Sequence, residues 1–421
     1  MNSAWGRRLG ASTLSLLACG DQISVGTDVF GCEQLAALCG TPTIELATSY
    51  TGVRTDVTAT LGPTWSRPTA AEVMVRAKDS GLWLFDVTKE GRLRTQHVSP
   101  SGDFAPEQTL SPPTGAYAGA AVVASIVASP DPAGPLLHVQ WSQLGERDCS
   151  GVIATPAANT LCPFKAELIA LDPDDLSRSR RTETCLQCGY GRVEAVYRSR
   201  DASRVELQGQ FRFAELTADG QPEWTTAQFG GREPIGSATI DADHWVVALA
   251  SSQNIEVGLS VVSRGGAFDY RVISQAVGSG NFPRALALIS GSTPGRYTLV
   301  VPRISPTFAT GDLSVVSFDS TKVVDEQVMV REGRTDLRLA AAAMDDAGSV
   351  FVAAATAESS ASPNQVMCKF PGPGTSTCLR MLVDLDTPQF PEGPKSSAFV
   401  ATTPGTVYGV GHGKLMRFDV P

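Results

Sequence analysis

The chain is poor in charged and aromatic side chains and has no long hydrophobic run. Of its 421 residues, 18% are charged and 7% aromatic, and 43 acidic against 34 basic residues give a formal net charge of −9. An acidic balance disfavours a nucleic-acid or anionic-membrane binder, because such proteins need a basic surface. No apolar run approaches the about 20 residues of a membrane-spanning helix. The low charge and a mean hydropathy of −0.01 disfavour intrinsic disorder.

Familiar catalytic motifs are missing as well. The sequence has neither G-x-S-x-G nor H-E-x-x-H, which position the nucleophile of many hydrolases and the zinc of many peptidases. Residues 409–414 (GVGHGK) are similar to a phosphate-binding loop, but Tyr408 stands where that motif requires its first glycine. We interpret the segment as a glycine-rich turn between the last two strands. No metal and no other cofactor is predicted.

Short acidic clusters are the remaining candidates for chemistry. Neighbouring carboxylates can hold Ca²⁺ or act as a hydrolytic pair, but aspartate is also common in turns. None of the clusters matches an EF-hand loop, so we interpret them as turn residues. His244, between Asp243 and Trp245, is interpreted as a strand-start residue rather than a catalytic base. The clusters are residues 172–175, 241–244, 345–346 and 384–386.

The first residues are typical of an export signal. Arg7 and Arg8 precede a mildly apolar stretch that ends in the letters LLAC at Cys19, and a basic start with an apolar run is the general pattern of secretion. The ending resembles the lipobox of bacterial lipoproteins, which implies that Cys19 becomes the acylated, palmitate-bearing N-terminus. An ordinary signal peptide, a buried segment with a chance cysteine, and twin-arginine export are the alternatives.

This resemblance implies three parts of the chain. Residues 1–18 form a cleaved signal peptide, residues 19–42 hold the lipidated cysteine with a linker and a short helix, and residues 43–421 form the β domain. Acyl chains anchor a protein to a membrane surface without a spanning helix. Gly20 follows Cys19, and glycine there does not retain a lipoprotein at the inner membrane in bacteria that read this position. The expected location is therefore the bacterial outer membrane or cell surface, with the periplasmic side as an alternative.

The nine cysteines support export, because disulfides persist in oxidising compartments. Apart from Cys19 they number eight, and pairing between near neighbours is the simplest of many connectivities. Cys368 and Cys378 flank a P-G-P-G turn between two strand-like segments, which predicts a hairpin with a cross-strand disulfide. The sequence-near pairs are Cys32 and Cys39, Cys149 and Cys162, Cys185 and Cys188, and Cys368 and Cys378.

The spacing of two of these pairs allows other interpretations than a simple disulfide between near neighbours. Cys185 and Cys188 form a C-x-x-C motif, which also occurs in redox-active dithiols and in zinc sites. Its flanks are typical of a strand and a turn, and the four histidines are scattered, so we favour a structural disulfide. Cys32 and Cys39 would be about 10 Å apart in an unbroken helix, beyond disulfide reach. Either that helix breaks or their partners lie elsewhere.

A strand-turn-strand unit recurs along the rest of the chain. Short β-branched, aromatic and alternating segments are separated by Gly, Pro, Asp or Ser, which predicts an all-β fold. Their starts are about 45 to 55 residues apart, with one gap of about 85, and this is the period of a four-stranded propeller blade. The hairpins begin near residues 82, 167, 211, 259, 313 and 365, and a seventh begins near residue 414 without a second strand.

These repeats resemble a bacterial β-propeller without signature motifs, over residues 43–421. The resemblance implies seven four-stranded blades, with small-residue segments such as 284–288 and 339–344 as the innermost strands. Residues 43–48 or their neighbours are expected to supply the outer strand of the last blade, which removes an open edge. Two smaller β domains split near Asp201, or stacked sandwiches, are the alternatives.

Arginines gather in one part of this acidic chain. They could bind an anionic glycan or a protein partner, but we interpret them as the solvated edge of an outer strand, where charge prevents aggregation. The arginines are Arg178, Arg180, Arg181, Arg192, Arg198, Arg200 and Arg204.

Two functions from different classes fit these observations. The first is a monomeric, lipid-anchored scaffold whose loops and channel face bind a protein or a glycan, with no identifiable catalytic motif. The second is a propeller enzyme that acts on a glycan or uses a quinone. Fold alone does not choose between them. Ionisable side chains converging on one mouth of the channel would favour the enzyme, and a channel lined by Ala, Ser and Val would favour the scaffold.

Overall fold

The computed structural model describes the chain from residue 51 onward with gaps, and two short strands before it. Its regular elements are β-strands, apart from one 3-10 turn, η1 (Leu176–Arg178). Among the described residues, no helix has the length and apolar character needed to cross a lipid bilayer. The described residues are 24–25, 28–29, 51–115, 121–129, 134–145, 160–172, 175–184, 193–198, 205–209, 213–217, 222–225, 232–239, 244–251, 256–263, 268–274, 287–290, 296–304, 311–319, 323–330, 337–356, 364–386 and 399–421.

Most of the strands belong to antiparallel four-stranded units in which each strand pairs with the next along the chain. β1 (Ser24–Val25) and β2 (Asp28–Val29) pair separately. The first sheet consists of β6 (Val73–Arg76), β7 (Leu82–Val87), β8 (Leu93–Val98) and β9 (Gln108–Leu110). It is followed by β10 (Ala121–Ser129), β11 (Leu136–Gly145), β12 (Thr160–Ala170) and β13 (Arg180–Thr184); by β14 (Val193–Arg198), β15 (Val205–Gly209), β16 (Phe213–Leu216) and β17 (Pro222–Thr225); and by β18 (Arg232–Thr239), β19 (His244–Ser251), β20 (Glu256–Ser263) and β21 (Phe268–Ser274).

The remaining sheets contain strands from both ends of the described chain. They are β22 (Ala287–Ser290), β23 (Arg296–Ile304), β24 (Gly311–Asp319) and β25 (Val323–Val330) with β3 (Thr51–Arg54); β26 (Leu337–Met344), β27 (Val350–Thr356), β28 (Gln365–Gly372) and β29 (Thr375–Met381) with β4 (Thr60–Leu61); and the last sheet, β30 (Phe399–Ala401), β31 (Thr406–Gly411) and β32 (Lys414–Asp419) with β5 (Trp65–Pro68).

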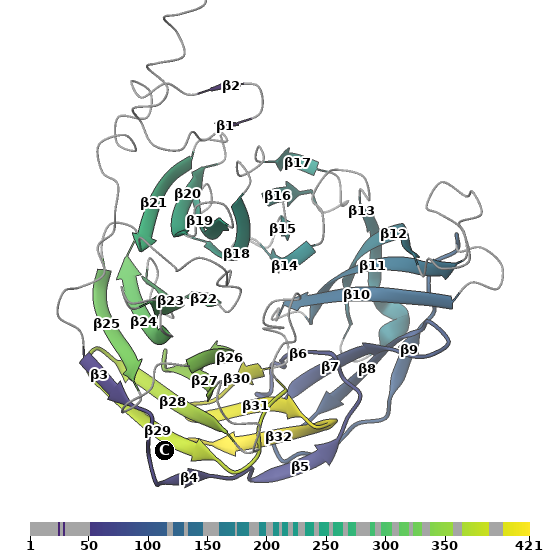
Figure 1. Cartoon of the computed structure of the whole chain (residues 1–421). Coiled ribbons are helices and arrows are strands. Elements are labelled where there is room, and N and C mark those ends of the chain that lie inside the picture. Colours follow the sequence, from purple (N-terminus) through teal and green to yellow (C-terminus); the bar gives the residue numbers. More distant parts are fainter. Residues whose placement is uncertain are drawn as a thin grey trace, which may run out of the picture.

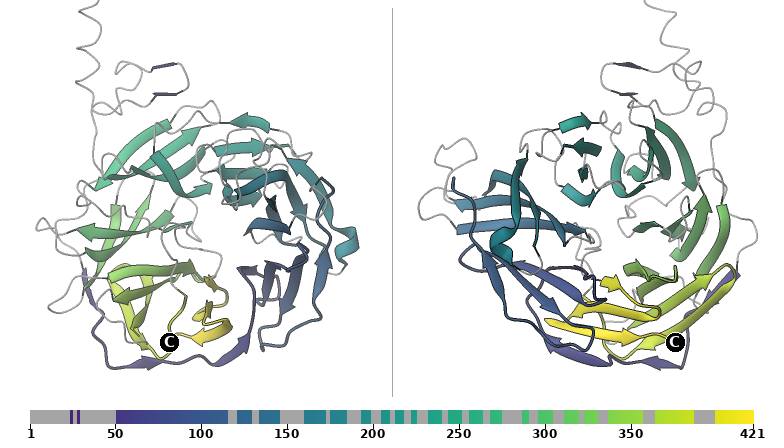
Figure 2. Two further views of the ribbon diagram at one scale, coloured as in Figure 1. Left: turned by 45° about the vertical axis from the view of Figure 1, so that its right-hand side comes forward. Right: turned by 180° about the vertical axis from the view of Figure 1, so that it is seen from behind.

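The sheets are arranged around an axis, as in a β-propeller (Figure 1). The first strand of each sheet contacts the first strand of the next, from β6 through β10, β14, β18, β22 and β26 to β30, and β30 in turn contacts β6. The two further views show the same circular arrangement (Figure 2). The small-residue segments that the sequence predicted as innermost overlap β22 and β26 and take part in this inner circle. An all-β, propeller-like architecture is therefore confirmed.

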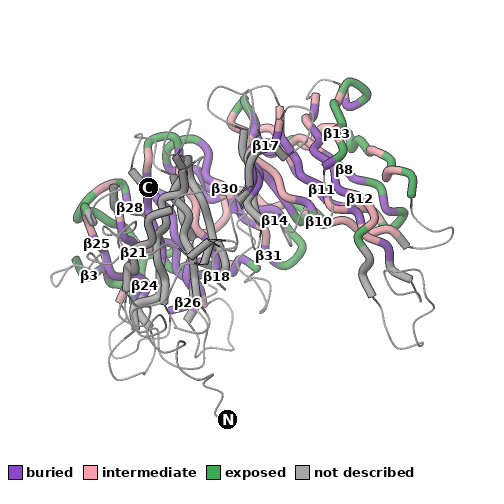
Figure 3. The backbone as a smooth tube through the Cα atoms, turned by 90° about the horizontal axis from the view of Figure 1, so that it is seen from above, coloured by how far each residue is buried: buried purple, intermediate pink, exposed green. Residues whose placement is uncertain are grey.

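Hydrophobic side chains fill the spaces between neighbouring sheets. Successive side chains of a strand point to opposite faces, so β7 contributes Phe85 to a core shared with β11 and Leu84 to a core shared with Tyr408 and Leu415 of the last sheet. Where side chains are described, buried residues follow the strands and exposed ones gather at the loops (Figure 3). Where side chains are described, the sheets thus bury both faces because each has a neighbour on either side.

An N-terminal segment crosses the outer edges of three sheets, and we call residues 51–69 the strap. β3 pairs in parallel with β25, β4 in parallel with β29, and β5 antiparallel with β32. In Figure 1 the strap is the purple trace along the lower outside of the ring. A strand from the N-terminal side does complete the last sheet, as the sequence predicted, but it is β5. Residues 43–48, which the sequence favoured for this role, lie outside the described residues.

Side-chain contacts fasten the strap to the last sheet. The Trp65 and Tyr408 rings lie 5.9 Å apart between their centroids, and burial raises the pKa of the Tyr408 phenol. The Thr64 hydroxyl donates to Asp419 Oδ2 at 2.7 Å, and Arg417 Nη1 donates to the Pro100 carbonyl of the first sheet at 2.6 Å. Gly102 has a φ of +88°, and a Cβ there would lie 2.8 Å from Trp65 Cε2. This close approach therefore requires glycine.

His138 on β11 predicts a pH dependence of stability. It is 3% exposed, and burial lowers its pKa from 6.5 to about 4. The unfolded chain takes up a proton as pH falls through 6.5, whereas the folded chain resists until about pH 4, so stability is lost across this window. When the pH falls from 7 to 4.5, the free energy of unfolding should decrease by about 2 kcal/mol more in the native chain than in the His138→Leu variant. Urea unfolding at both pH values measures this difference, and equal losses would contradict it.

Candidate functional site

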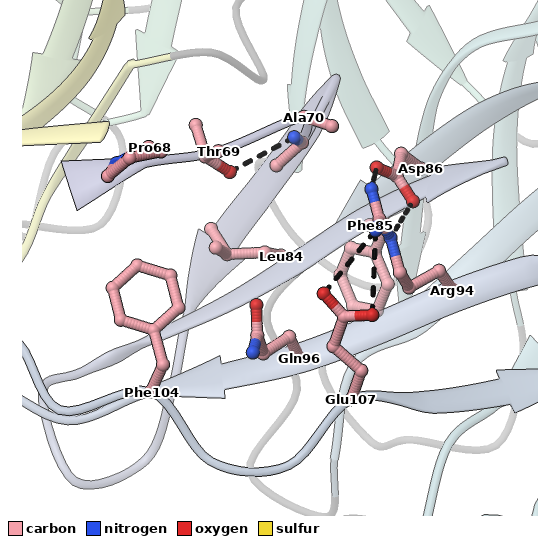
Figure 4. Close-up of a pocket in the computed structure, with 11 residues that line it drawn as sticks. Pro68, Thr69, Ala70, Leu84, Phe85, Asp86, Arg94, Gln96, Phe104 and Glu107 are labelled. Carbon is pink, nitrogen blue, oxygen red and sulfur yellow. Dashed lines mark hydrogen bonds and ion pairs between the residues drawn. The ribbon is translucent and has the colours of Figure 1, made fainter. Parts of the chain in front are cut away.

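A polar groove lies where the first sheet meets the strap. Its volume is about 370 Å³, which is in the range of small-ligand sites. One wall is the connection from β5 to β6, and the opposite wall is the face of β7 and β8 (Figure 4). The lining residues are Pro68, Thr69, Ala70, Ala71, Leu84, Phe85, Asp86, Arg94, Gln96, Phe104 and Glu107.

Strand alternation places the polar residues of the groove. Asp86 is two residues after Leu84 on β7, so both side chains point to the face toward the last sheet. In the β7–β8 ladder Asp86 lies opposite Arg94 and Leu84 lies opposite Gln96. The Asp86–Arg94 pair is ionic, and the neighbouring Leu84–Gln96 pair joins an aliphatic side chain with an amide. The groove therefore has a charged end and an end that combines apolar and amide groups.

Arg94 is held between two carboxylates of unequal exposure. Its Nε donates to Asp86 Oδ1 at 2.7 Å and its Nη2 donates to Asp86 Oδ2, while Asp86 is only 5% exposed. Nη1 reaches the Glu107 oxygens at 3.3 and 3.5 Å, and the Glu107 side chain is 51% exposed. The hydrogen bonds to Asp86, and less so the charge of Glu107, raise the pKa of Arg94. Asp86 and Arg94 are therefore a fixed pair, and Glu107 is a loosely held carboxylate at the rim.

The other end of the groove combines apolar walls with hydrogen-bond acceptors. The Gln96 amide nitrogen donates to the Ala105 carbonyl at 2.9 Å, which turns the amide oxygen toward the groove (Figure 4). The Thr69 hydroxyl accepts from the Ala71 N–H at 3.1 Å. Phe104, Leu84 and Pro68 supply the apolar surface. The sequence contained one signal for this site, an aspartate at a core-facing position of the apolar strand LWLFDV, which the sequence analysis did not use.

The described acidic clusters accept backbone hydrogen bonds. Asp345 accepts from the backbone N–H groups of residues 347, 349 and 405, and Asp175 caps η1 by accepting from the Ser177 N–H at 2.9 Å. These two are turn residues, as interpreted from the sequence. Asp384 instead accepts from residues 364 and 365, and Asp386 from residue 412, so they tie the segment after β29 to distant parts of the chain. Residues 173–174 and 241–243 lie outside the described part of the chain.

The histidines are dispersed, as expected. His97 lies 3.2 Å from Asp79 and its ring centroid is 5.0 Å from that of Trp83. His412 has a φ of +54° in the two-residue turn that joins β31 to β32; the expected turn between the last two strands is confirmed, but residues 409–411 belong to β31 and Lys414 to β32. His244 is the first residue of β19, and its side chain is not described. Among the described residues, no group of three His, Cys, Asp or Glu side chains is placed to hold a metal ion.

One pair of the candidate cysteines lies fully within the described residues. Cys368 on β28 is the register partner of Cys378 on β29, and the two form a disulfide with Cα atoms 4.1 Å apart. Cys162 belongs to β12, but its side chain is not described. The candidate lipidation site and the remaining cysteines lie outside the described residues: Cys19, Cys32, Cys39, Cys149, Cys185 and Cys188.

Removing the Cys368–Cys378 disulfide is expected to cause a moderate loss of stability. Replacing both Cys368 and Cys378 by serine frees a loop whose ends are 10 residues apart. The chain-entropy estimate for such a loop is about 3 kcal/mol. Denaturant unfolding without reducing agent should show this loss in the double variant, and a reducing agent should lower the stability of the native chain by about this much more than that of the variant. An unchanged midpoint in both comparisons would contradict the structural role of the bond.

The arginine-rich segment begins in η1, where Arg178 pairs with Asp175, and continues on an outer strand. Arg180 is exposed on β13, at the outer edge of its sheet. Arg181 instead donates to Glu167 Oε2 at 2.6 Å, the same oxygen that accepts from Trp141 Nε1 at 3.1 Å. The solvated edge interpretation therefore holds for Arg180, whereas Arg181 fixes a buried carboxylate. Arg192, Arg200, Arg204 and the side chain of Arg198 lie outside the described residues.

Comparisons with known proteins give structural likenesses at low identity. No protein family and no curated protein matches the chain. A fungal alcohol oxidase of the AA5 family in complex with copper is 10% identical, with 87% of this chain and 77% of the oxidase covered and a TM-score of 0.43. A puromycin-hydrolysing peptidase of Mycobacterium tuberculosis is 11% identical, with 79% and 58% covered and a TM-score of 0.35.

A prolyl endopeptidase gives a third likeness. It is 13% identical, with 84% of this chain and 50% of the endopeptidase covered and a TM-score of 0.43. The chain thus spans about half the length of the endopeptidase. Identities this low, with TM-scores below 0.5, assign neither activity nor substrate to this chain.

Proposed function

We propose that the chain is an exported, lipid-anchored, seven-bladed β-propeller that acts as a binding scaffold at the bacterial cell envelope. The observation that carries the binding role is the groove between the first sheet and the strap, with its fixed Asp86–Arg94 pair beside an apolar wall. A cavity that combines an apolar wall with a few placed polar groups is typical of ligand sites. The groove is formed where the end of the strap lies over β7 and β8, so binding depends on the docked strap.

The pairing of the strands supports a count of seven blades. Each blade is one four-stranded unit, and β5 supplies the fourth strand of the last blade. β3 and β4 add parallel strands to the outer edges of two blades without forming a blade of their own. The contacts of the innermost strands run through one complete circle. Seven units with no open gap between the last and the first support a closed propeller.

Three of the inner strands are rich in small residues, which supports a scaffold, whereas β14 (VEAVYR) and β18 (REPIGSAT) also carry charged residues. The inner strands β10, β22 and β26 have the sequences AVVASIVAS, ALIS and LRLAAAAM. Near the inner circle, Arg76 of β6 pairs with Asp346 in the turn after β26, and hydrogen bonds from Arg76 lower the pKa of Asp346. This pair joins two sheets that lie on either side of the last sheet, which is a structural role.

Export and anchoring rest on two independent features. The LLAC ending at Cys19 supports acylation, and a single acyl chain is only a marginal anchor, so stable attachment requires more than one chain. The Cys368–Cys378 disulfide supports an oxidising compartment. We therefore place the protein at the outer membrane or the cell surface, with residues 1–18 removed and residues 19–50 linking the anchor to the strap.

Labelling with an alkyne analogue of palmitate tests the anchor. The full-length chain, expressed in a bacterium that processes lipoproteins, should carry the label and partition with membranes. Cys19→Ser should lose both properties, and Cys39→Ser should keep them as the matched cysteine control. Mass spectrometry should find a modified N-terminal peptide that begins at Cys19. An intact Met1, or label retained by Cys19→Ser, would contradict the proposal.

A further inference from the structure

Two groups in the groove can accept hydrogen bonds from a ligand. The Gln96 amide donates to the Ala105 carbonyl and offers its oxygen to the groove. Glu107 keeps its exposed carboxylate at the rim, since its contacts with Arg94 are long. Each nitrogen of Arg94 already donates to a carboxylate, two of them to Asp86 and one to Glu107. The groove can therefore take a ligand that donates hydrogen bonds to Gln96 and Glu107.

The net negative charge of the groove also favours a hydrogen-bond donor that carries positive charge. Asp86 and Glu107 are two carboxylates against the single guanidinium of Arg94. Because Asp86 and Arg94 satisfy one another, the excess negative charge is located at Glu107. A neutral sugar would need donors and acceptors together, whereas an ammonium group needs only acceptors and negative charge.

The apolar wall favours a ligand whose positive group is attached to an alkyl chain. Leu84, Phe104 and Pro68 line the end of the groove beside Gln96, and Glu107 lies at the charged end next to Arg94. An alkyl chain along the apolar residues would be removed from water while its ammonium group reached toward the charged end. A volume of about 370 Å³ holds one extended side chain with its bound water.

From these observations we propose that the groove binds a primary ammonium group on an aliphatic chain, as in the lysine side chain of a partner protein. The alkyl stem lies against Leu84 and Phe104, and the ammonium group donates to the Glu107 carboxylate and the Gln96 amide oxygen. Asp86 orients Arg94, and Arg94 keeps Glu107 at the rim. The ligand class rests on the proposed binding role of the groove, but not on the proposed lipid anchor.

The test uses Nα-acetyl-lysine N-methylamide as the probe and its Nε-acetylated form as the uncharged match. Saturation-transfer NMR with the folded chain should give a dissociation constant about tenfold lower for the charged probe. Glu107→Gln should weaken binding of the charged probe by a similar factor and leave binding of the acetylated probe unchanged. Added salt should also weaken binding of the charged probe, because salt screens the charge of the exposed Glu107 carboxylate.

Glu183→Gln is the matched control. Glu183 is also a largely exposed carboxylate with one partner, Lys165 at 3.0 Å, but it lies on β13 outside the groove. This variant should bind the charged probe as the native chain does. Equal binding of the two probes, or an unaffected Glu107→Gln variant, would overturn the lysine assignment. A neutral methyl glycoside that binds instead would leave the scaffold standing with a glycan ligand, whereas failure of all three probes would also remove the groove as its binding site.

Discussion

A chain that begins at residue 70 is expected to be much less stable than one that begins at residue 50. The shorter chain lacks the strap, so β32 loses its outer partner β5 and the Tyr408 ring loses Trp65. Removing a large aromatic side chain from a core costs about 3 to 5 kcal/mol, and each lost backbone hydrogen bond adds about 1 kcal/mol. We expect a loss of about 5 kcal/mol or more, measured by urea unfolding.

The same loss of edge pairing should change the behaviour of the chain in solution. An exposed strand edge is a site for pairing with other chains, so the shorter chain should also self-associate in size-exclusion chromatography. Because it could fail to fold altogether, Trp65→Ala in the full chain provides a milder version with a loss of about 3 kcal/mol, the lower end of the range for aromatic side chains because Trp65 is only half-buried. Exposed Arg67→Ala on the same strand is the control, with little expected effect. Equal stability of the two truncated chains would contradict the closing role of the strap.

Arg94→Met is expected to destabilise the fold by about 3 kcal/mol. It leaves the Asp86 carboxylate buried at 5% exposure without the guanidinium that now donates two hydrogen bonds to it. Removing one partner of a buried ion pair costs about 3 to 5 kcal/mol, and the partial exposure of Arg94 favours the lower end. Thermal or urea unfolding measures the change.

Two further variants identify the cause of that loss. Asp86→Leu combined with Arg94→Met should recover most of the stability, since no unpaired charge remains and Leu84 already makes this face apolar. Arg54→Met removes the exposed pair between Arg54 and Asp56, where the Arg54 side chain is 65% exposed, and should cost less than about 1 kcal/mol. A double variant as unstable as Arg94→Met alone would show that the arginine stem, not the charge, is responsible.

The sequence was sufficient to predict most of the hairpins and the inner strands. The LWLFDV segment became β7, the Cys368 and Cys378 segments became β28 and β29, and the alanine-rich segment became β26. These elements were predictable because alternation and turn residues act locally. The turn at residues 411–414 was predictable for the same reason, since adjacent positive φ values at His412 and Gly413 fit a two-residue hairpin turn.

The strap and the groove were not predictable in this way. β3 and β4 are short, largely exposed segments whose strand character comes from pairing with β25 and β29. The groove brings together residues between 68 and 107 that lie at the end of the strap, on β7 and β8 and in the loop before β9, so its members share no local pattern. Asp86 was the local exception, because an aspartate on the core-facing side of an apolar strand requires a partner. Its sequence position did not reveal that Glu107 would share that partner.

Cross-linking of β5 to β32 tests the closed ring most directly. Pro68 and Lys414 are exposed register partners in this antiparallel pair, and partner Cα atoms in such pairs are about 4.5 to 5.5 Å apart, within disulfide range. Pro68→Cys with Lys414→Cys should form a disulfide under mild oxidation, identified by mass spectrometry of the joined peptides. Thr51→Cys with Lys414→Cys should not, because Thr51 pairs with Gln327. A cross-link in the second variant, or none in the first, would contradict a ring closed by the strap.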